Sequence, residues 1–130
     1  MDRTPGLTLD SGALIAVERN KRRAVALIKA AIVNRMMVTI PTPVIAEAWR
    51  GGSYLSPLLR DLYDHANRDS IDDALAKRAG EALAATGRAD TIDALVMASA
   101  SRRGDRVLTG DFEDLTRFAD CFPEVRVLSL

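Results

Sequence analysis

The sequence predicts an α/β fold of three layers, in which a mostly parallel sheet is covered by helices on both faces. Short apolar segments with the length of β-strands alternate along the chain with longer segments of helical character, a pattern typical of this class. The apolar segments do not alternate with polar residues, so we expect them to be buried on both faces of the sheet. Five strands are expected, or four if the weakest of them does not form.

Start and stop signals place two strands and four helices in the first half of the chain. Ser11, Thr42 and Ser56 stand where a side chain can cap a helix, and proline follows two of them at the first helical position, which suits its fixed backbone angle. Gly51 and Gly52 end the helix that opens after Thr42. The expected strands cover residues 6–10 and 37–40, and the expected helices cover residues 11–18, 21–34, 43–50 and 57–65.

The second half of the chain is expected to contain three helices and the remaining strands. Asp72 and Asp90 are placed to cap two helices, which Gly87 and Gly104 close, because glycine readily adopts the left-handed conformation at a helix end. The expected helices begin near residues 72, 90 and 111, and the expected strands cover residues 70–71, which is the weakest, 106–109 and 125–128.

The composition fits a single domain over residues 1–130. Hydrophobic residues make up 48% of the chain and charged residues 28%, which suits a globular chain better than a disordered one. Eighteen basic residues balance 18 acidic ones, so nucleic-acid binding would need a local asymmetry of charge. Cys121 and His65 are the only residues of their types, which excludes an intramolecular disulfide and a zinc site built from cysteines and histidines.

No segment is expected to enter a membrane, and we expect the protein in the cytoplasm. The apolar stretch from Leu7 to Val17 is interrupted by Asp10 and followed by Glu18, which makes it a poor core for a signal peptide. No apolar run approaches the roughly 20 residues needed to span a bilayer. A reducing compartment also agrees with the single cysteine.

Four acidic residues stand where a parallel sheet would bring them together. Asp10 follows the first strand, Glu47 lies on the helix after the second, Asp93 lies near a helix start, and Asp111 follows a later strand. Ligands of such sheets bind beyond the carboxyl ends of the strands. Carboxylates packed together repel one another, so a lasting cluster needs a cation. Oxygen ligands select hard ions such as Mg²⁺ or Mn²⁺, which can activate water to attack a phosphodiester.

Each acid also has a plain structural interpretation. Asp90 with Asp93, and Asp111 with Asp114, resemble a helix N-cap with an acid in the first turn. Taken singly, Asp90 and Asp114 are better explained by such a role, since acids near a helix start interact favourably with its dipole.

Asp10 and Glu47 are harder to explain by local structure alone. Asp10 could be a loop acid that helps Ser11 to cap the next helix, but its place at the end of a strand favours a functional role. Glu47 lies on a largely apolar helix, so we expect its carboxylate to be partly buried. Its alternative partner is Arg50, three residues on.

The order of the four acids and the residues around them resemble the PIN-domain family, especially the toxin branch of VapBC-type toxin–antitoxin pairs. The likeness spans nearly the whole chain, and its most specific segment begins at Asp93. The segments that carry it are LTLDSG at residues 7–12, TPVIAE at 42–47, DALVMASA at 93–100 and VLTGDFEDL at 107–115. Gly110 and Leu115 depart from the basic residue and the phenylalanine that the toxins often have there.

The resemblance implies a three-layer PIN-like fold and a metal-dependent endoribonuclease, the toxin of a pair, that inhibits translation or growth. It implies one or two Mg²⁺ or Mn²⁺ ions and RNA products with a 3′-hydroxyl and a 5′-phosphate. Asp10 and Asp93 would be the main metal ligands. The rest of the implied set consists of Glu47 and Asp111 as further ligands, Asp90 and Asp114 as additional or alternative ones, and Ser11 and Thr109 as supporting hydroxyls.

An RNA substrate needs basic side chains around an acidic pocket, and the resemblance also implies a homodimer and a small antitoxin. The antitoxin would lay an amphipathic segment into an apolar groove. Candidates for the RNA rim are Lys21, Arg22, Arg23, Arg50, Arg88, Arg102 and Arg103. A solvated helix start is an equal alternative for the run from Lys21 to Arg23, and a favourable helix C-terminus for Arg102 and Arg103. Candidates for the groove are Ile15, Val17, Leu27, Ile28, Trp49 and Tyr54, which by default are core residues.

Two other function classes are open at this point. A non-catalytic PIN-like module would bind protein or RNA while its acids only cap helices. An α/β enzyme that transfers phosphate could use Asp10 as its nucleophile, but Gly12 stands where such phosphatases need a second aspartate. The nuclease is the preferred hypothesis.

Overall fold

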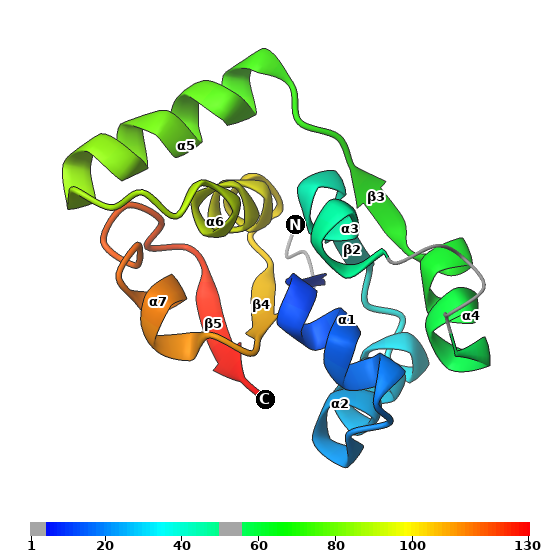
Figure 1. Cartoon of the computed structure of the whole chain (residues 1–130). Helices are drawn as coiled ribbons and strands as arrows, with labels where there is room; N and C mark the ends of the chain where they lie inside the picture. Colours follow the sequence, from blue (N-terminus) through cyan, green and yellow to red (C-terminus); the bar gives the residue numbers. More distant parts are fainter. Residues whose placement is uncertain (1–4, 50–55) are drawn as a thin grey trace.

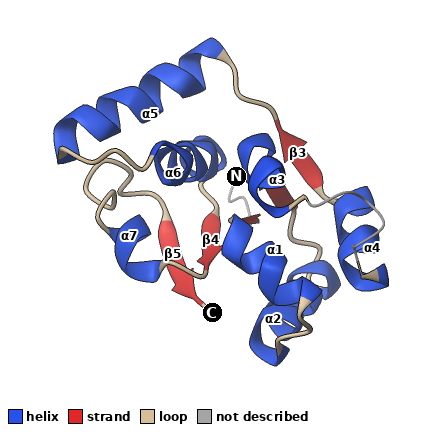
Figure 2. Ribbon diagram, in the orientation of Figure 1, coloured by secondary structure: helices blue, strands red, loops and turns tan. Residues whose placement is uncertain are grey.

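The computed structural model describes residues 5–49 and 56–130, and this part of the chain forms five strands and seven helices (Figures 1 and 2). In chain order they are β1 (Leu7–Leu9), α1 (Ser11–Glu18), α2 (Arg22–Val33), β2 (Val38–Pro41), α3 (Thr42–Ala48), α4 (Pro57–His65), β3 (Asn67–Asp69), α5 (Asp73–Thr86), α6 (Thr91–Arg103), β4 (Arg106–Thr109), α7 (Phe112–Thr116) and β5 (Arg126–Ser129). The predicted α/β class is confirmed.

The strands form one parallel sheet in the order β3-β2-β1-β4-β5. The central strand β1 pairs with β2 through Leu7 and Val38, and with β4 through Leu9 and Leu108. The chain fills one half of the sheet with β2 and β3 and then crosses to the other half with β4 and β5. The winding therefore reverses between β1 and β4, which is where open α/β sheets bind their ligands.

Helices cover both faces of the sheet, as predicted (Figure 1). On one face α6 packs against β1, β2 and β4, and α5 packs on the outside of α6. On the other face α1 contacts β1 and β4, and α2 contacts β2. No helix in the described ranges is long and apolar enough to cross a membrane.

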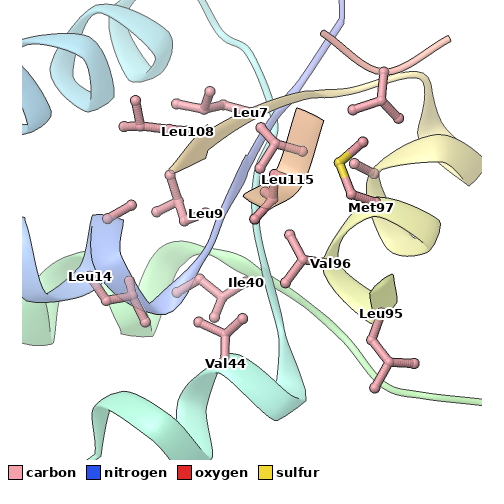
Figure 3. Packing of buried hydrophobic residues seen from close by; sticks show 14 of the residues in the cluster. Leu7, Leu9, Leu14, Ile40, Val44, Leu95, Val96, Met97, Leu108 and Leu115 are labelled. Atoms are coloured by element: carbon pink, nitrogen blue, oxygen red, sulfur yellow. The ribbon is translucent and has the colours of Figure 1, made fainter. Parts of the chain in front are cut away.

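The central strands and α6 supply much of the core (Figure 3). Every residue from Ala94 to Ser101 in α6 is buried, because this helix lies between the sheet and α5. Leu9, Ile40 and Leu108 of the strands are fully buried in the same cluster. Burial of each large aliphatic side chain of this kind contributes about 1.5–3 kcal/mol, so the core holds the strand ends in fixed positions.

Several helix ends follow the sequence signals. The side chains of Ser56 and Asp72 each accept a hydrogen bond from the backbone N–H three residues on, at 3.1 and 2.8 Å. Gly87 and Gly104 end α5 and α6 with φ of 68° and 69°, in the left-handed region that glycine adopts without strain. These predictions are confirmed.

Three predicted caps are wrong. Asp10 caps α1, because its carboxylate accepts the backbone N–H three residues on at 2.8 Å, and Ser11 is the first helical residue instead. Thr42 is likewise the first residue of α3, with no side-chain capping bond at that end. Asp90 occupies the cap position of α6 but makes no capping bond, because its carboxylate pairs with Arg88.

The weakest strand forms, but earlier in the chain than predicted. It covers Asn67–Asp69 and pairs with β2, because the residues that follow it turn toward the cap of α5. Helix α3 ends at Ala48, and the two glycines predicted to end it, Gly51 and Gly52, lie outside the described residues.

A polar network that the sequence did not predict is buried at the amino-terminal ends of β1 and β4. Asp105 is only 2% exposed and accepts hydrogen bonds from the N–H of Gly6 at 3.0 Å, the hydroxyl of Thr8 at 2.8 Å and Nε of Arg103 at 2.9 Å. Arg103 also pairs with Asp69 at 2.7 Å. The carboxylate of Asp105 therefore ties β1 to the end of α6, and Arg103 extends the network to Asp69 of β3.

Candidate metal centre

An acidic pocket of about 490 Å³ lies beyond the carboxyl ends of β1 and β4. Its lining includes six acids: Asp10, Glu47, Asp90, Asp93, Asp111 and Asp114. All six were singled out in the sequence, and no Lys, Arg or His from the described ranges lines the pocket. Acids that are far apart along the chain thus meet where the winding of the sheet reverses.

Asp10 is the most buried of the pocket acids, with 5% of its surface exposed. One of its carboxylate oxygens accepts the N–H of Ala13 and the other accepts the hydroxyl of Thr109. Burial raises the pKa of Asp10 above its usual value, although the hydrogen bonds from Thr109 and from the backbone lower it. The turn from β1 into α1 therefore holds this carboxylate in one orientation.

Thr109 joins the two loops that bear site acids. Its hydroxyl donates to Asp10 and accepts the N–H of Asp111 at 2.7 Å. Ser11 lines the pocket itself. Both hydroxyls thus lie beside the acids, where they could support the acids as expected from the sequence.

Two glycines allow the loops after β1 and β4 to approach closely. A Cβ added to Gly12 would lie 3.0 Å from the N and Cα atoms of Gly110, and a Cβ on Gly110 would lie 3.3 Å from the Cα of Gly12. The neighbours are backbone atoms, which cannot move aside as a flexible side chain can. Gly110, at the position where the toxins often have a basic residue, is therefore part of the contact that brings the two loops together.

Asp93, Asp111 and Asp114 form a close acidic group, in which one carboxylate oxygen of each lies within 4.8 Å of the other two. Burial, followed by the charges of Asp111 and Asp10, raises the pKa of Asp93 to about 6. Desolvation and the neighbouring Asp114 also raise the pKa of Asp111. Both Asp111 and Asp114 face Asp93, so the geometry supports both of the alternatives left open by the sequence.

Glu47 lines the same pocket but is exposed, so the prediction of a partly buried carboxylate is wrong. The reason is its place in the last turn of the short helix α3, where the pocket opens to solvent. Its proposed alternative partner, Arg50, lies outside the described residues.

Two of the arginines proposed for the RNA rim lie elsewhere. Arg102 and Arg103 are at the far end of α6 from Asp93. Arg102 pairs with Asp69 at 2.7 Å and with Asp72 at 2.8 Å, and Arg103 belongs to the network around Asp105. These two side chains therefore form ion pairs within the fold and do not lie at the rim of the pocket, where they were predicted.

Among the other rim candidates, Arg88 does not line the pocket but contacts acids that do. It pairs with two pocket acids, Asp90 at 2.7 Å and Asp114 at 3.5 Å. Lys21, Arg22 and Arg23 are exposed near the start of α2, and none of them lines the pocket. Arg23 donates to the backbone oxygen of Ser129 at 2.9 Å.

The donor set of the pocket fits a hard divalent cation. The six acids offer only oxygen ligands, which suit Mg²⁺ or Mn²⁺. Burial raises the pKa of Asp10, and burial together with neighbouring acids raises the pKa of Asp93 and Asp111, which is the direction expected where a cation would stabilise the charged carboxylates. The volume also leaves room for several waters of about 30 Å³ each, which Mg²⁺ usually keeps when it binds.

The candidates for an apolar groove are mostly core residues. Val17 and Ile28 are buried, Leu27 is partly buried, Ile15 and Trp49 are 38% and 41% exposed, and Tyr54 lies outside the described residues. A different apolar surface lies between α2 and α4, where a groove of about 670 Å³ is lined by residues that include Ile32, Met37 and Leu62. Ile32 and Met37 are 56% and 55% exposed, and neither was among the groove candidates proposed from the sequence.

The acidic pocket should make the stability of the ion-free protein depend on pH. The folded pKa of Asp93, about 6, lies above its ordinary value of 3.8. This carboxyl therefore stabilises the fold most at a pH below 3.8, and its contribution is lost as the pH rises through about 6. With EDTA present, we expect the Tm to fall from pH 5 to pH 7, and we expect Mn²⁺ to remove most of that fall.

Thermal denaturation at several pH values checks this expectation. Since Asp10 and Asp111 shift in the same direction, Asp93→Asn should reduce the slope of Tm against pH without abolishing it. An identical slope in the wild type and in this variant would contradict the assignment of the shift to Asp93.

Comparisons with known proteins agree with the fold. The family described as PIN domain matches residues 7–120. No curated protein is significantly similar in sequence. The chain is similar in structure to VapBC2 from Rickettsia felis bound to a DNA fragment from its promoter, with a TM-score of 0.70, 15% identity, and coverage of 95% of this chain and 98% of that one.

Two further solved structures have the same fold. One is FitAB bound to an IR36 DNA fragment, with a TM-score of 0.66, 16% identity, and coverage of 95% of this chain and 94% of that one. The other is FitAcB from Neisseria gonorrhoeae, with a TM-score of 0.62, 17% identity, and coverage of 94% and 96%. From the family match over residues 7–120, the parallel sheet and the pocket at its centre, we conclude that the chain belongs to the PIN domain family.

Proposed function

We propose that this protein is a metal-dependent endoribonuclease, and that it is the toxin of a toxin–antitoxin pair. The observation that carries the proposal is the convergence of six acids on one pocket at the reversal point of the sheet. Membership of the PIN domain family, whose members are generally nucleases, supports the same chemistry. The proposed substrate is RNA and the proposed ion is Mg²⁺ or Mn²⁺.

In this proposal Asp10, Asp93 and Asp111 hold the ion. Asp10 is oriented by Thr109, while Asp93 and Asp111 face one another within the close acidic group. Asp114 belongs to that group and serves as a further ligand, and Glu47 completes the set directly or through water from the open side of the pocket. Asp90 takes an outer place, because its carboxylate is already paired with Arg88.

The bound ion supplies activation of a water molecule and neutralisation of the charge that develops on the phosphodiester. The residues of the chain hold the carboxylates in position. Thr109 fixes the Asp10 carboxylate, and the contact between Gly12 and Gly110 keeps the loops that carry Asp10 and Asp111 together. These contacts hold the acids in place before any ligand arrives, which lowers the cost of reaching the reactive arrangement.

The alternative of a non-catalytic PIN-like module assigns the acids to helix capping. Asp10 does cap α1, but Asp90 and Asp111 stand at the cap positions of α6 and α7 without a side-chain capping bond. Capping therefore leaves most of the acidic pocket unexplained, and this favours the nuclease.

The proposal includes a homodimer and a small antitoxin that binds through an amphipathic segment. The apolar groove between α2 and α4 supports such a partner, because Ile32, Val33 and Met37 are 56%, 79% and 55% exposed at or near it. Large exposed apolar side chains of this kind mark protein interfaces. The FitAB and VapBC2 structures are themselves named as two-component assemblies.

Cleavage of end-labelled single-stranded and hairpin RNA tests the proposed reaction. We expect internal cuts with Mn²⁺ or Mg²⁺, none with EDTA, and recovery when the metal is restored. The products should carry a 5′-phosphate and a 3′-hydroxyl. Cleavage that is unchanged in EDTA would refute metal dependence, and RNA that is bound but never cut would favour the non-catalytic module.

A further inference from the structure

Arg88 is a basic side chain in contact with the acidic pocket. Within the described residues, two ion pairs involve an acid of the pocket, and Arg88 is the basic partner in both. Its Nε and Nη2 lie 2.8 and 2.7 Å from Oδ2 of Asp90, and Nη2 lies 3.5 Å from Oδ1 of Asp114. The guanidinium therefore spans two acids, one from the start of α6 and one from α7.

The backbone holds Arg88 in this position. It follows Gly87, which ends α5 in the left-handed conformation, and its own N–H donates to the hydroxyl of Thr86 at 3.4 Å. Only two residues separate it from the start of α6, which packs along α5. A side chain on so short a connection has little freedom to leave the rim of the pocket.

The contacts of Arg88 leave part of the guanidinium free for another anion. An arginine has five N–H donors in a rigid fork, and within the described residues none of the hydrogen bonds of Arg88 involves Nη1. The side chain is 23% exposed, so it is reachable from solvent at the same time as it touches Asp90 and Asp114.

The negative charge of the pocket explains why a basic side chain is needed beside it. A polyanion that approaches six carboxylates is repelled, and basic side chains in contact with phosphates offset that repulsion. Arg102 and Arg103 are engaged at the other end of α6, and no ion pair within the described residues joins Lys21, Arg22 or Arg23 to an acid of the pocket. Arg88 is the candidate whose position and free donor meet both requirements.

We infer that Arg88 binds a backbone phosphate of the RNA at the rim of the acidic pocket, with Asp90 and Asp114 holding its guanidinium in place. This inference rests on the proposed nuclease function and assigns the substrate contact that the acids themselves cannot make. Charge-assisted pairing of arginine with phosphate is strong and directional, so the contact would also fix where the RNA strand crosses the pocket.

The test compares Arg88→Met and Arg88→Lys with a matched variant, Arg78→Met. Arg78 is an ion-paired arginine of α5 that contacts Glu124 at 3.0 Å and no pocket acid. We expect Arg88→Met to raise KM for a short single-stranded RNA by roughly 10-fold, as loss of one charge-assisted contact predicts, with kcat within about 2-fold. Arg88→Lys should recover part of the KM change, and Arg78→Met should match the wild type.

Two readouts separate a phosphate contact from a purely structural role. Binding of a fluorescein-labelled single-stranded RNA in the presence of Ca²⁺ should weaken in Arg88→Met. The slope of the logarithm of the binding constant against the logarithm of the salt concentration should become shallower by about the value of one phosphate contact. The affinity for Mn²⁺, measured by calorimetry without RNA, should not fall. If Arg88 only positioned Asp90 and Asp114, the Mn²⁺ affinity and kcat would fall together and lysine would restore neither.

The outcomes distinguish this inference from the proposal on which it rests. If the wild type cuts RNA but KM, RNA affinity and salt dependence are the same in Arg88→Met, the assignment to Arg88 is overturned and the nuclease proposal stands. If the wild type binds RNA without cutting it in Mn²⁺, the nuclease proposal fails, and the binding measurement with Ca²⁺ still decides whether Arg88 contacts the RNA.

Discussion

Asp93→Asn is expected to abolish RNA cleavage while making the ion-free protein more stable at neutral pH. The substitution keeps the shape of the side chain but removes a charge that faces Asp111 and Asp10. Loss of a proposed ligand should lower kcat/KM by at least about 100-fold, because even the partners behind metal ligands contribute about 10- to 100-fold. Loss of the repulsion should raise the Tm in EDTA at pH 7 by several degrees, because the wild-type carboxyl is destabilising there.

The matched control is Asp73→Asn. Asp73 lies in the first turn of α5, just as Asp93 lies in the first turn of α6, but it pairs with Lys77 at the surface, at 2.8 Å. This variant should keep both the activity and the Tm of the wild type. Full activity in Asp93→Asn, or an equal loss in both variants, would contradict the role given to Asp93.

Asp105→Ala is expected to produce the largest loss of stability of any substitution considered. It leaves the N–H of Gly6 and the hydroxyl of Thr8 without their buried acceptor, and it removes one carboxylate from Arg103. Breaking a buried ion pair on one side costs about 3–5 kcal/mol, a large share of the roughly 5–15 kcal/mol that stabilises a domain. Urea unfolding followed by circular dichroism measures the change.

Asp105→Asn separates the effect of charge from that of shape. It keeps one acceptor oxygen in the same space, so we expect a loss of stability between those of the wild type and Asp105→Ala. One ordinary hydrogen bond contributes a net free energy of about 1 kcal/mol. If the unfolding free energy of Asp105→Ala differs from that of the wild type by no more than this, the network is not a main support of the sheet.

The parts of the fold that depend on neighbouring residues could be predicted from the sequence. The caps at Ser56 and Asp72 and the glycine ends at Gly87 and Gly104 are set by backbone groups a few residues away. The weakest strand was displaced because its position depends on pairing with β2 and on contacts of Asp69 with α6, which no local pattern reveals.

The acids of the pocket could be predicted because their order and surrounding segments carry a family pattern, while their individual environments could not. Asp90 looked like a capping residue, and the structure pairs it with Arg88. Glu47 was expected to be partly buried because its neighbours on the helix are largely apolar. Its exposure follows from the place of α3 at the edge of the pocket, which only the assembled fold shows.

Contacts across the whole chain were beyond prediction. Asp105 follows a helix-ending glycine and looks like an ordinary loop acid, yet its partner Gly6 is 99 residues away. Its place directly before an expected strand is the one local signal that could have drawn attention to Asp105. Arg102 and Arg103 looked like cations at a helix end, and only the placement of β3 beside α6 shows that Asp69 engages them.

Anomalous scattering from crystals soaked in Mn²⁺ tests the central claim most directly. We expect a manganese peak inside the acidic pocket, bound by carboxylate oxygens of Asp10, Asp93 and Asp111. A pocket without manganese at millimolar concentration, with these three carboxylates turned apart toward solvent, would contradict it.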